Sequence, residues 1–594
     1  MRQRRVLTAL AIPLALALVA ASCGSDDSSS DSTTAPDGTE ATESTEGGET
    51  ETETETETTE PQTAPEEVDT SVVAETGTAV YGGTVTMALE SEATGLRPWE
   101  DSCSSPCYNI MRSIYDPLTD QYAAGGYGPY LAESLESNDD FTVWTMTLRP
   151  DVTFHNGTAL TAQTIVDMFP IQQAGAAASS AIAASGLTGV TAVDDLTVEY
   201  TLAAPFVAFP SYLAGAPLGM PFDPAAATAD PTGYSTNPIG TGPFVMKSRD
   251  IDNETVVERN PDYWRTLENG DQLPYLDSIS FRPIPDEGTR LDALTSGTVN
   301  AMQTLRQGTI RDARAVGDSI SLIEAQGNNT GGGMFNTAVP PFDDQRVRLG
   351  LNKMNDQERV IEALGGTGIS LPSTQWFSVD SPWWTQAAAD SYPTFDFEGG
   401  KALLEEYVND PARSDGKAPG EKIDVELSCP PDPTLIAAMQ VLEQVWSGSE
   451  LVNVSLTQFD QATHINNAVS DEHRAHCWRW GGDTDPAAQI NPFVADSAVS
   501  VANFPNFDDP EMVAWADEAN ATDDFETRKD LYSKIMVRIN EQAITWYSGS
   551  TATLVATAPD VRGILTWTMP NGELGTGILP DNNVRWFQVY ISDE

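Results

Sequence analysis

The segment between residues 423 and 456 restricts the fold of this chain more than any other. Apolar and polar residues alternate over 423–427 and again over 452–456, which is typical of half-buried strands. Between them, apolar residues recur every three or four positions from Leu435 to Val445, which predicts a helix. Two strands joined by a helix run parallel through a crossover that is almost always right-handed. The fold class is therefore α/β.

Other segments support a mixed fold without visible internal repeats. Residues 84–89, 141–148 and 196–202 predict strands, and Thr161 is a plausible N-cap for a short helix. An apolar stripe of Leu531, Ile535 and Ile539 predicts a late helix that begins at Asp523 or Asp524. A chain of 594 residues is too long for one ordinary core and suggests about two to four lobes or domains.

The N-terminus has the pattern of a secretory signal. A basic start is followed by an apolar run from Val6 to Ala20 and by small residues before Cys23. The run is short for a membrane span, and Pro13 interrupts it. Ala20-Ala21-Ser22-Cys23 resembles a bacterial lipobox. We expect residues 1–22 to be a signal peptide and Cys23 to carry a lipid, with plain secretion as the alternative.

Residues 23–79 predict a disordered acidic tether. Residues 24–70 hold 16 carboxylates and no Lys or Arg, and Glu and Thr alternate from Glu49 to Thr58. Such a segment buries no apolar surface, and its charges repel one another. The whole chain has 88 acidic and 31 basic residues, a net charge of −57. This acidity argues against a nucleic-acid partner, which needs a basic surface.

Four cysteines remain after Cys23, an even number that suggests disulfides in an exported protein. Cys103 and Cys107 are close enough in sequence to close a small loop, and Cys429 could bridge to Cys477. Connectivity does not follow from spacing, so these pairs are hypotheses. The cysteines lack the neighbouring ligands that a metal site needs.

Four blocks of sequence, in order, resemble the family 5 extracellular solute-binding proteins, which deliver peptides, nickel chelates and some sugars to ABC importers. The first block contains Trp144-Thr-Met-Thr-Leu-Arg149 and Phe154-His155-Asn156-Gly157-Thr158, and the others are Pro238-Ile-Gly-Thr-Gly-Pro-Phe244, Glu258-Arg-Asn-Pro-Asp-Tyr-Trp264 and the segment from Phe335 to Arg348. The resemblance covers most of residues 80–594. Single blocks are weak, whereas four in order are specific.

The resemblance implies a two-lobed, periplasmic-binding-protein-like (type II) fold that closes on a ligand, with an additional small domain. Lobe I would comprise residues 80–118, 235–330 and 545–594. The small domain would comprise residues 119–234, and lobe II residues 331–544. A monomer is expected.

Two motifs in these blocks are interpreted as scaffold. His155 ends a strand before Asn156-Gly157, a favoured hairpin dipeptide, and is expected to be a structural turn residue. Gly240 and Gly242 beside Pro243 suggest backbone with positive φ in a sharp strand-to-strand turn.

The stretch from Cys477 to Pro486 is the main candidate for ligand contact. Trp478 and Trp480 alternate onto one face of a predicted strand. In peptide-binding members of the family, a carboxylate in a matching stretch pairs with the α-ammonium of the peptide. This resemblance assigns that role to Asp483, with Asp485 as the alternative. Both could instead cap a turn before Pro486.

A second candidate is the glycine-rich segment that contains Gly332, Met334 and Asn336. Its glycines would let the backbone approach an extended peptide and bind it as an added strand. A flexible crossover between the lobes is the alternative. Trp376 lies where the family often contributes cleft side chains, and apolar core is its alternative role.

The sequence thus predicts the substrate-binding component of an ABC importer, not an enzyme and without a cofactor. It would capture a small extracellular solute, with an oligopeptide favoured, and deliver it to the membrane subunits while a lipid anchors it outside the cytoplasmic membrane. An oligosaccharide or metal chelate is the alternative solute. Two other classes stay open, a zinc enzyme built on Asp471, His473, His476 and Cys477, and a structural envelope lipoprotein.

Overall fold

Ten strands from nearly the whole chain form one mixed sheet in the computed structural model, which describes residues 79–101, 103–481, 485–498, 500, 502–578 and 583–593. Across the sheet they are β14 (Val452–Gln458), β13 (Ile423–Cys429), β15 (Ala475–Gly481), β12 (Ser321–Phe335), β16 (Thr545–Thr557), β11 (Ala301–Thr304), β1 (Thr84–Leu89), β10 (Ser278–Pro283), β9 (Glu254–Arg259) and β8 (Phe244–Asp250).

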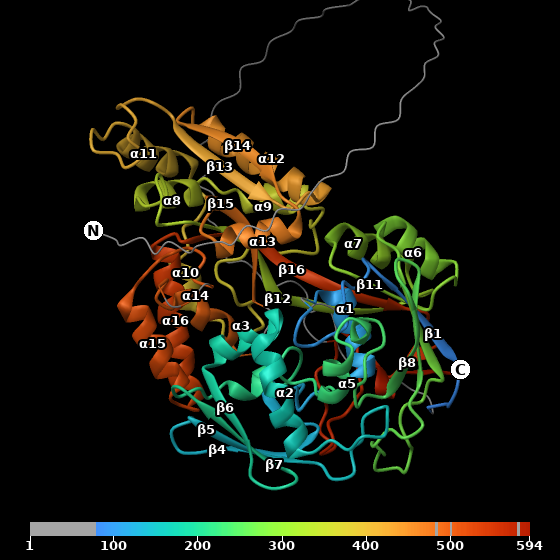
Figure 1. Cartoon of the computed structure of the whole chain (residues 1–594). Coiled ribbons are helices and arrows are strands. Elements are labelled where there is room, and N and C mark those ends of the chain that lie inside the picture. Colours follow the sequence, from blue (N-terminus) through green and yellow to red (C-terminus); the bar gives the residue numbers. More distant parts are fainter. Residues whose placement is uncertain are drawn as a thin grey trace, which may run out of the picture. The chain divides into compact units, whose positions relative to one another are not determined.

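Two long strands hold this sheet together. β12 has 15 residues and β16 has 13, and they pair antiparallel from Ser321↔Thr557 to Met334↔Thr545. β12 also pairs with β15, whereas β16 also pairs with β11. They therefore join the strand group of β13, β14 and β15 to the group that contains β1 and β8 (Figure 1). We call β12 and β16 the hinge strands.

The predicted strand–helix–strand unit is confirmed. β13 and β14 pair in parallel, with Ile423 opposite Val452, and α12 (Pro433–Gly448) connects them. The Asp432 side chain accepts hydrogen bonds from the first-turn amides of Thr434 and Leu435 and so caps the helix. The apolar face of α12 packs into a core shared with β13.

A second, four-stranded antiparallel sheet lies within residues 119–234. Its strands, in spatial order, are β4 (Ala132–Ser137), β5 (Val143–Leu148), β7 (Thr197–Leu202) and β6 (Leu187–Ala192). Helix α2 (Ala162–Ala174) contacts β6 and β7 and begins at the predicted N-cap. There, Thr161 and Thr164 exchange side-chain and backbone hydrogen bonds as a capping box.

The remaining elements cover these sheets and connect their strands (Figure 1). The helices are α1 (Ser105–Ile114), α3 (Ala176–Ser185), α4 (Phe209–Tyr212), α5 (Pro224–Ala229), η1 (Gly233–Ser235), α6 (Glu287–Thr295), α7 (Gln307–Val316), α8 (Gln345–Lys353), α9 (Gln357–Ala363), α10 (Gln386–Ser391), α11 (Phe397–Val408), α13 (Gln461–Val469), α14 (Ala487–Val494), α15 (Pro510–Asn520), α16 (Phe525–Glu541) and η3 (Trp586–Gln588). The short strands are β2 (Thr119–Gln121), β3 (Tyr127–Pro129), β17 (Val561–Arg562) and β18 (Tyr590–Ile591). Asp524 caps α16, as predicted, and the stripe of Leu531, Ile535 and Ile539 is buried.

The prediction that Gly240 and Gly242 adopt positive φ in a strand-to-strand turn was wrong. Neither has positive φ, and the segment leads into β8 from a bend and does not turn between two strands. A Cβ on Gly240 would stand 2.2 Å from the carbonyl oxygen of Ile114, and one on Gly242 would stand 2.5 Å from the same atom. These glycines therefore allow close backbone approach. His155 binds this segment, with Nε2 3.1 Å from the carbonyl oxygen of Gly242.

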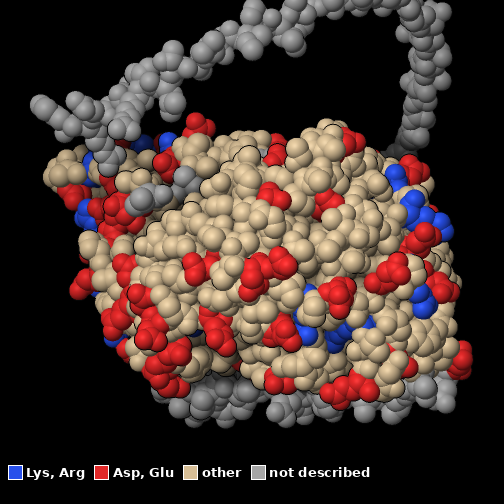
Figure 2. Space-filling view, turned by 60° about the horizontal axis from the view of Figure 1, so that its bottom comes forward, with Lys and Arg blue, Asp and Glu red and all other residues tan. Residues whose placement is uncertain are grey.

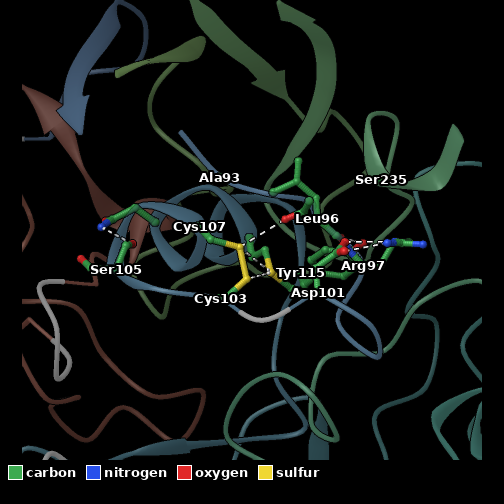
Figure 3. The surroundings of a disulfide bond; sticks show 12 residues. Ala93, Leu96, Arg97, Asp101, Cys103, Ser105, Cys107, Tyr115 and Ser235 are labelled. Carbon is green, nitrogen blue, oxygen red and sulfur yellow. Dashed lines mark hydrogen bonds and ion pairs between the residues drawn. A yellow bond between two sulfur atoms is a disulfide. The ribbon is translucent and has the colours of Figure 1, made fainter. Parts of the chain in front are cut away.

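Cys103 is joined to Cys107 and Cys429 to Cys477, with Cα–Cα distances of 5.2 and 5.1 Å. The first bond ties the loop before α1 to the first turn of that helix (Figure 3). Beside it, the Tyr115 hydroxyl donates to the carbonyl of Leu96 at 2.9 Å. The second bond joins strands β13 and β15, which are neighbours in the sheet.

Acidic side chains are scattered over the face drawn in Figure 2, and basic ones form only small groups. Apart from residues whose placement is left out, no helix combines the length and the apolar character needed to cross a bilayer.

Candidate functional site

The end of β15 brings three of the predicted ligand residues together beside the hinge strands. The indoles of Trp376 and Trp480 stack with centroids 4.6 Å apart and planes 5° apart, and Phe493 meets both edge-on. Trp478 lies two positions earlier in β15, and its ring centroid is 6.4 Å from that of Trp480. Trp376 and Trp480 are only 1% and 3% exposed, so in this structure they are core residues.

Asp485 has a partner that sequence reasoning missed. Its two carboxylate oxygens accept hydrogen bonds from Arg528 of α16, both at 2.7 Å, and Oδ1 also accepts from the amide of Ala487. The guanidinium of Arg528 lies over the ring of Trp383. A carboxylate engaged in this way is poorly suited to receive a ligand ammonium. Asp483 lies outside the described residues, as does Cys23.

The hypothesis that residues 327–336 bind a peptide as an added strand does not fit the sheet. From Asn329 to Met334, β12 pairs with β15 on one side and with β16 on the other. A strand with both edges paired has no backbone groups left for a third partner. Gly332 and Met334 lie within this paired stretch, and Met334 is fully buried.

Asn336 is likewise occupied by the protein itself. Its Nδ2 donates to the carbonyls of Asp471 and His473, and its Oδ1 accepts from the amide of Ala338. It is fully buried, so it locks the end of β12 to the loop before β15. A direct ligand contact for Met334 or Asn336 finds no support in this arrangement.

Charged residues near the hinge strands were not predicted. Glu90 directly follows β1, and burial raises the pKa of its carboxyl, while Arg306, Arg290 and Arg479 act in the opposite direction. Arg306 also pairs with Asp432 at 2.8 Å, which joins the segment after β11 to the start of α12. Two features of the sequence could have pointed to these residues: Glu90 directly follows a predicted strand, and Arg479 lies between two tryptophans.

Three of the four histidines form a buried cluster next to Trp478. The rings of His464 and His476 stack with centroids 3.5 Å apart, and His473 lies 5.3 Å from His476. Nε2 of His476 donates a hydrogen bond to the backbone carbonyl of His464. Because a neutral imidazole has one donor and one acceptor nitrogen, Nδ1 of His476 accepts a hydrogen bond from the Ser428 hydroxyl, at 2.8 Å.

The zinc hypothesis placed Asp471, His473, His476 and Cys477 together. Cys477 is instead bonded to Cys429. Over the described ranges, no group of three or more His, Cys, Asp or Glu is arranged to hold a metal ion.

We expect the contribution of the buried histidines to stability to fall as pH decreases below about 6.5, the usual pKa of histidine. Burial lowers the pKa of His476 to about 3 and that of His473 to about 4. Below 6.5 the unfolded chain binds protons that the folded chain does not, so stability is full above that pH and decreases toward pH 4. Urea unfolding of wild type and His476→Gln between pH 8 and 4.5 tests this. The stability difference between the two proteins should shrink on acidification, and a constant difference would contradict the assignment.

Comparison with known proteins identifies the class and then the family. The structure of the Helicobacter pylori periplasmic binding protein DppA in complex with the peptide STSA superimposes with a TM-score of 0.71, at 20% identity, covering 86% of this chain and 99% of that one. The fold is thus that of two-lobed periplasmic binding proteins. The model for bacterial extracellular solute-binding proteins, family 5 (middle), matches residues 126–500, more than half of the chain. The chain belongs to this family.

Two relatives match over most of their length. The dipeptide-binding protein of Escherichia coli (strain K12) is 26% identical over 514 residues, 80% of this chain and 90% of the relative. Heme-binding protein A of Haemophilus influenzae is 27% identical over 453 residues, 70% of this chain and 77% of the relative. Family 5 proteins are the extracytoplasmic solute-binding components of ABC importers, and this chain is one of them.

Proposed function

We propose that this protein captures an oligopeptide between two lobes connected by the hinge strands and delivers it to the permease of an ABC importer. The observation that carries the proposal is the end of β15, where Trp480 lies opposite Thr330 of the hinge strand β12 and stacks on Trp376. The names of the dipeptide-binding relative and of the peptide complex of DppA support a peptide ligand. The protein would act by binding, without catalysis.

We further propose that Asp483 receives the α-ammonium of the peptide. Arg528 already engages Asp485, which leaves Asp483 as the other carboxylate of that stretch in the sequence. The lobe boundaries are proposed as 80–118, 235–330 and 545–594 for lobe I, 331–544 for lobe II and 119–234 for the small domain. A lipid on Cys23 and the acidic segment after it would hold the monomeric receptor near the membrane.

Mass spectrometry of small molecules released from the purified protein tests the ligand class. The protein should release peptides after denaturation. A sugar or a metal chelate in their place would replace the peptide assignment within the same family.

Asp483→Ala should weaken peptide binding by about ten-fold or more, because a charged hydrogen bond to the ligand is lost. Titration calorimetry with a peptide identified by mass spectrometry measures the change. Asp523→Ala, in the exposed segment just before α16, is the matched control and should bind like wild type. Equal affinity of Asp483→Ala and wild type would rule out the ammonium role.

A further inference from the structure

A pocket of about 290 Å³ lies away from the hinge strands, where the end of β5 meets two hairpin loops. One loop follows Trp264 and is closed by a bridge between Thr266 and Gln272, and the other is closed by a bridge between Thr568 and Leu574. The lining includes Arg149, Trp264, Arg265, Glu268, Thr568 and Met569. Two of the family sequence blocks therefore meet here, that of Arg149 and that of Trp264.

Buried hydrogen bonds hold the aromatic wall of the pocket in place. Nε1 of Trp264 donates to Oδ2 of Asp116 at 2.7 Å, and the hydroxyl of Tyr263 donates to Oδ1 at 3.1 Å. Asp116 is 2% exposed, so this anchoring lies beneath the surface. The Trp264 ring thus has a defined orientation before any ligand arrives.

The two arginines of the pocket differ in how many of their guanidinium nitrogens have hydrogen-bond partners. Arg265 is 3% exposed, and it donates to the hydroxyl of Tyr130 at 3.1 Å and to the carbonyl of Thr568. Arg149 donates through Nε to the carbonyl of Tyr130 at 2.7 Å, and its guanidinium lies over the Trp264 ring at 5.5 Å. Within the described part of the chain, the terminal nitrogens of Arg149 have neither a hydrogen-bond nor an ion-pair partner.

The side chains that line the pocket include two arginines, Arg149 and Arg265, and one acidic residue. Arg265 is held by uncharged groups, and the two guanidinium groups repel each other. Glu268 is the acidic residue in the lining, and Glu133 is a nearby acidic neighbour of Arg149 without contact to it.

We propose that this pocket is a second binding site, separate from the solute site at the hinge strands, for a small organic anion with an apolar body. The terminal nitrogens of Arg149 would bind its carboxylate or phosphate group, because a planar guanidinium matches both. The apolar body would pack on Trp264 and Met569. The volume is at the lower end of small-molecule pockets, about 300 Å³.

Titration calorimetry with the full chain tests this site, with benzoate and phenyl phosphate as anionic probes and benzyl alcohol as the neutral one. The anions should bind and the alcohol should not, and the tighter anion identifies the preferred group. Arg149→Gln should weaken anion binding by about ten-fold, whereas Glu268→Gln should strengthen it about two-fold or more by removing a repelling charge.

Arg562→Gln is the matched control, because Arg562 does not line the pocket and the substitution removes the same charge. It should leave anion binding unchanged. Thermal unfolding of each variant checks that it is folded. If Arg149→Gln does not fold, Glu268→Gln, at an exposed position, still decides the outcome. Absence of anion binding, or equal binding by wild type and Glu268→Gln, would overturn the proposal.

Discussion

Arg585→Met should lower the free energy of unfolding by about 3–5 kcal/mol, because it leaves a buried carboxylate without its counter-ion. Arg585 and Asp120 form an ion pair whose side chains are 2% and 0% exposed. Arg112 lies close enough to sense both charges, but no ion pair joins it to Asp120 in the described structure. The loss should therefore be only partly compensated. Urea unfolding followed by circular dichroism measures it.

The double variant Asp120→Leu/Arg585→Met separates the pair from simple packing. Removing both charges should recover much of the stability lost in the single variant, since a buried pair contributes little over apolar residues of similar size. Arg311→Met is the surface control, because its pair with Asp312 is more than half exposed, and it should change stability by about 1 kcal/mol at most. A double variant less stable than Arg585→Met would show that the ion pair is not the cause.

Gly332→Ala should lower the free energy of unfolding by about 3 kcal/mol, at the upper end of what overpacking costs. A Cβ at this position would stand 1.9 Å from the carbonyl oxygen of Trp546 in the neighbouring hinge strand. The obstacle is backbone, so the two strands would have to separate. Because β12 and β16 pair along most of their length, ligand affinity should fall as well.

Gly331→Ala is the matched control for this substitution, one position earlier in the same strand. Its nearest neighbour to a new Cβ is at 3.7 Å, an ordinary contact distance. The control should therefore stay within about 1 kcal/mol of wild type. Equal losses from the two substitutions would mean that strand propensity, and not the contact with Trp546, limits this position.

The elements that sequence reasoning predicted well are those with a strong local pattern. The unit from β13 to β14 repeats apolar residues at strand and helix periods, and Thr161 carries the residue type of an N-cap. Such patterns depend on neighbours within a few positions, so they are visible in the sequence.

The candidate site was predicted less completely, because its contacts join distant segments. Trp376 and Trp480 were expected near the ligand, and they do meet, but as stacked core residues. The partner of Asp485 is Arg528, 43 positions away, and no local pattern connects them. Asn336 was predicted to contact the ligand because it follows a glycine-rich segment. In the structure its side chain instead binds the carbonyls of Asp471 and His473 in the loop before β15.

The fold class, the family and the strand–helix–strand unit from β13 to β14 could be predicted from the sequence, since each depends on local order along the chain. The export signal of the N-terminus stays a prediction. Only the tertiary structure decided why Gly240, Gly242 and Gly332 are glycines, which carboxylate near β15 is already paired, and that Arg149 meets Trp264 at a pocket. These features arise where strands and loops far apart in sequence come within contact distance, and side-chain patterns carry little information about such pairings.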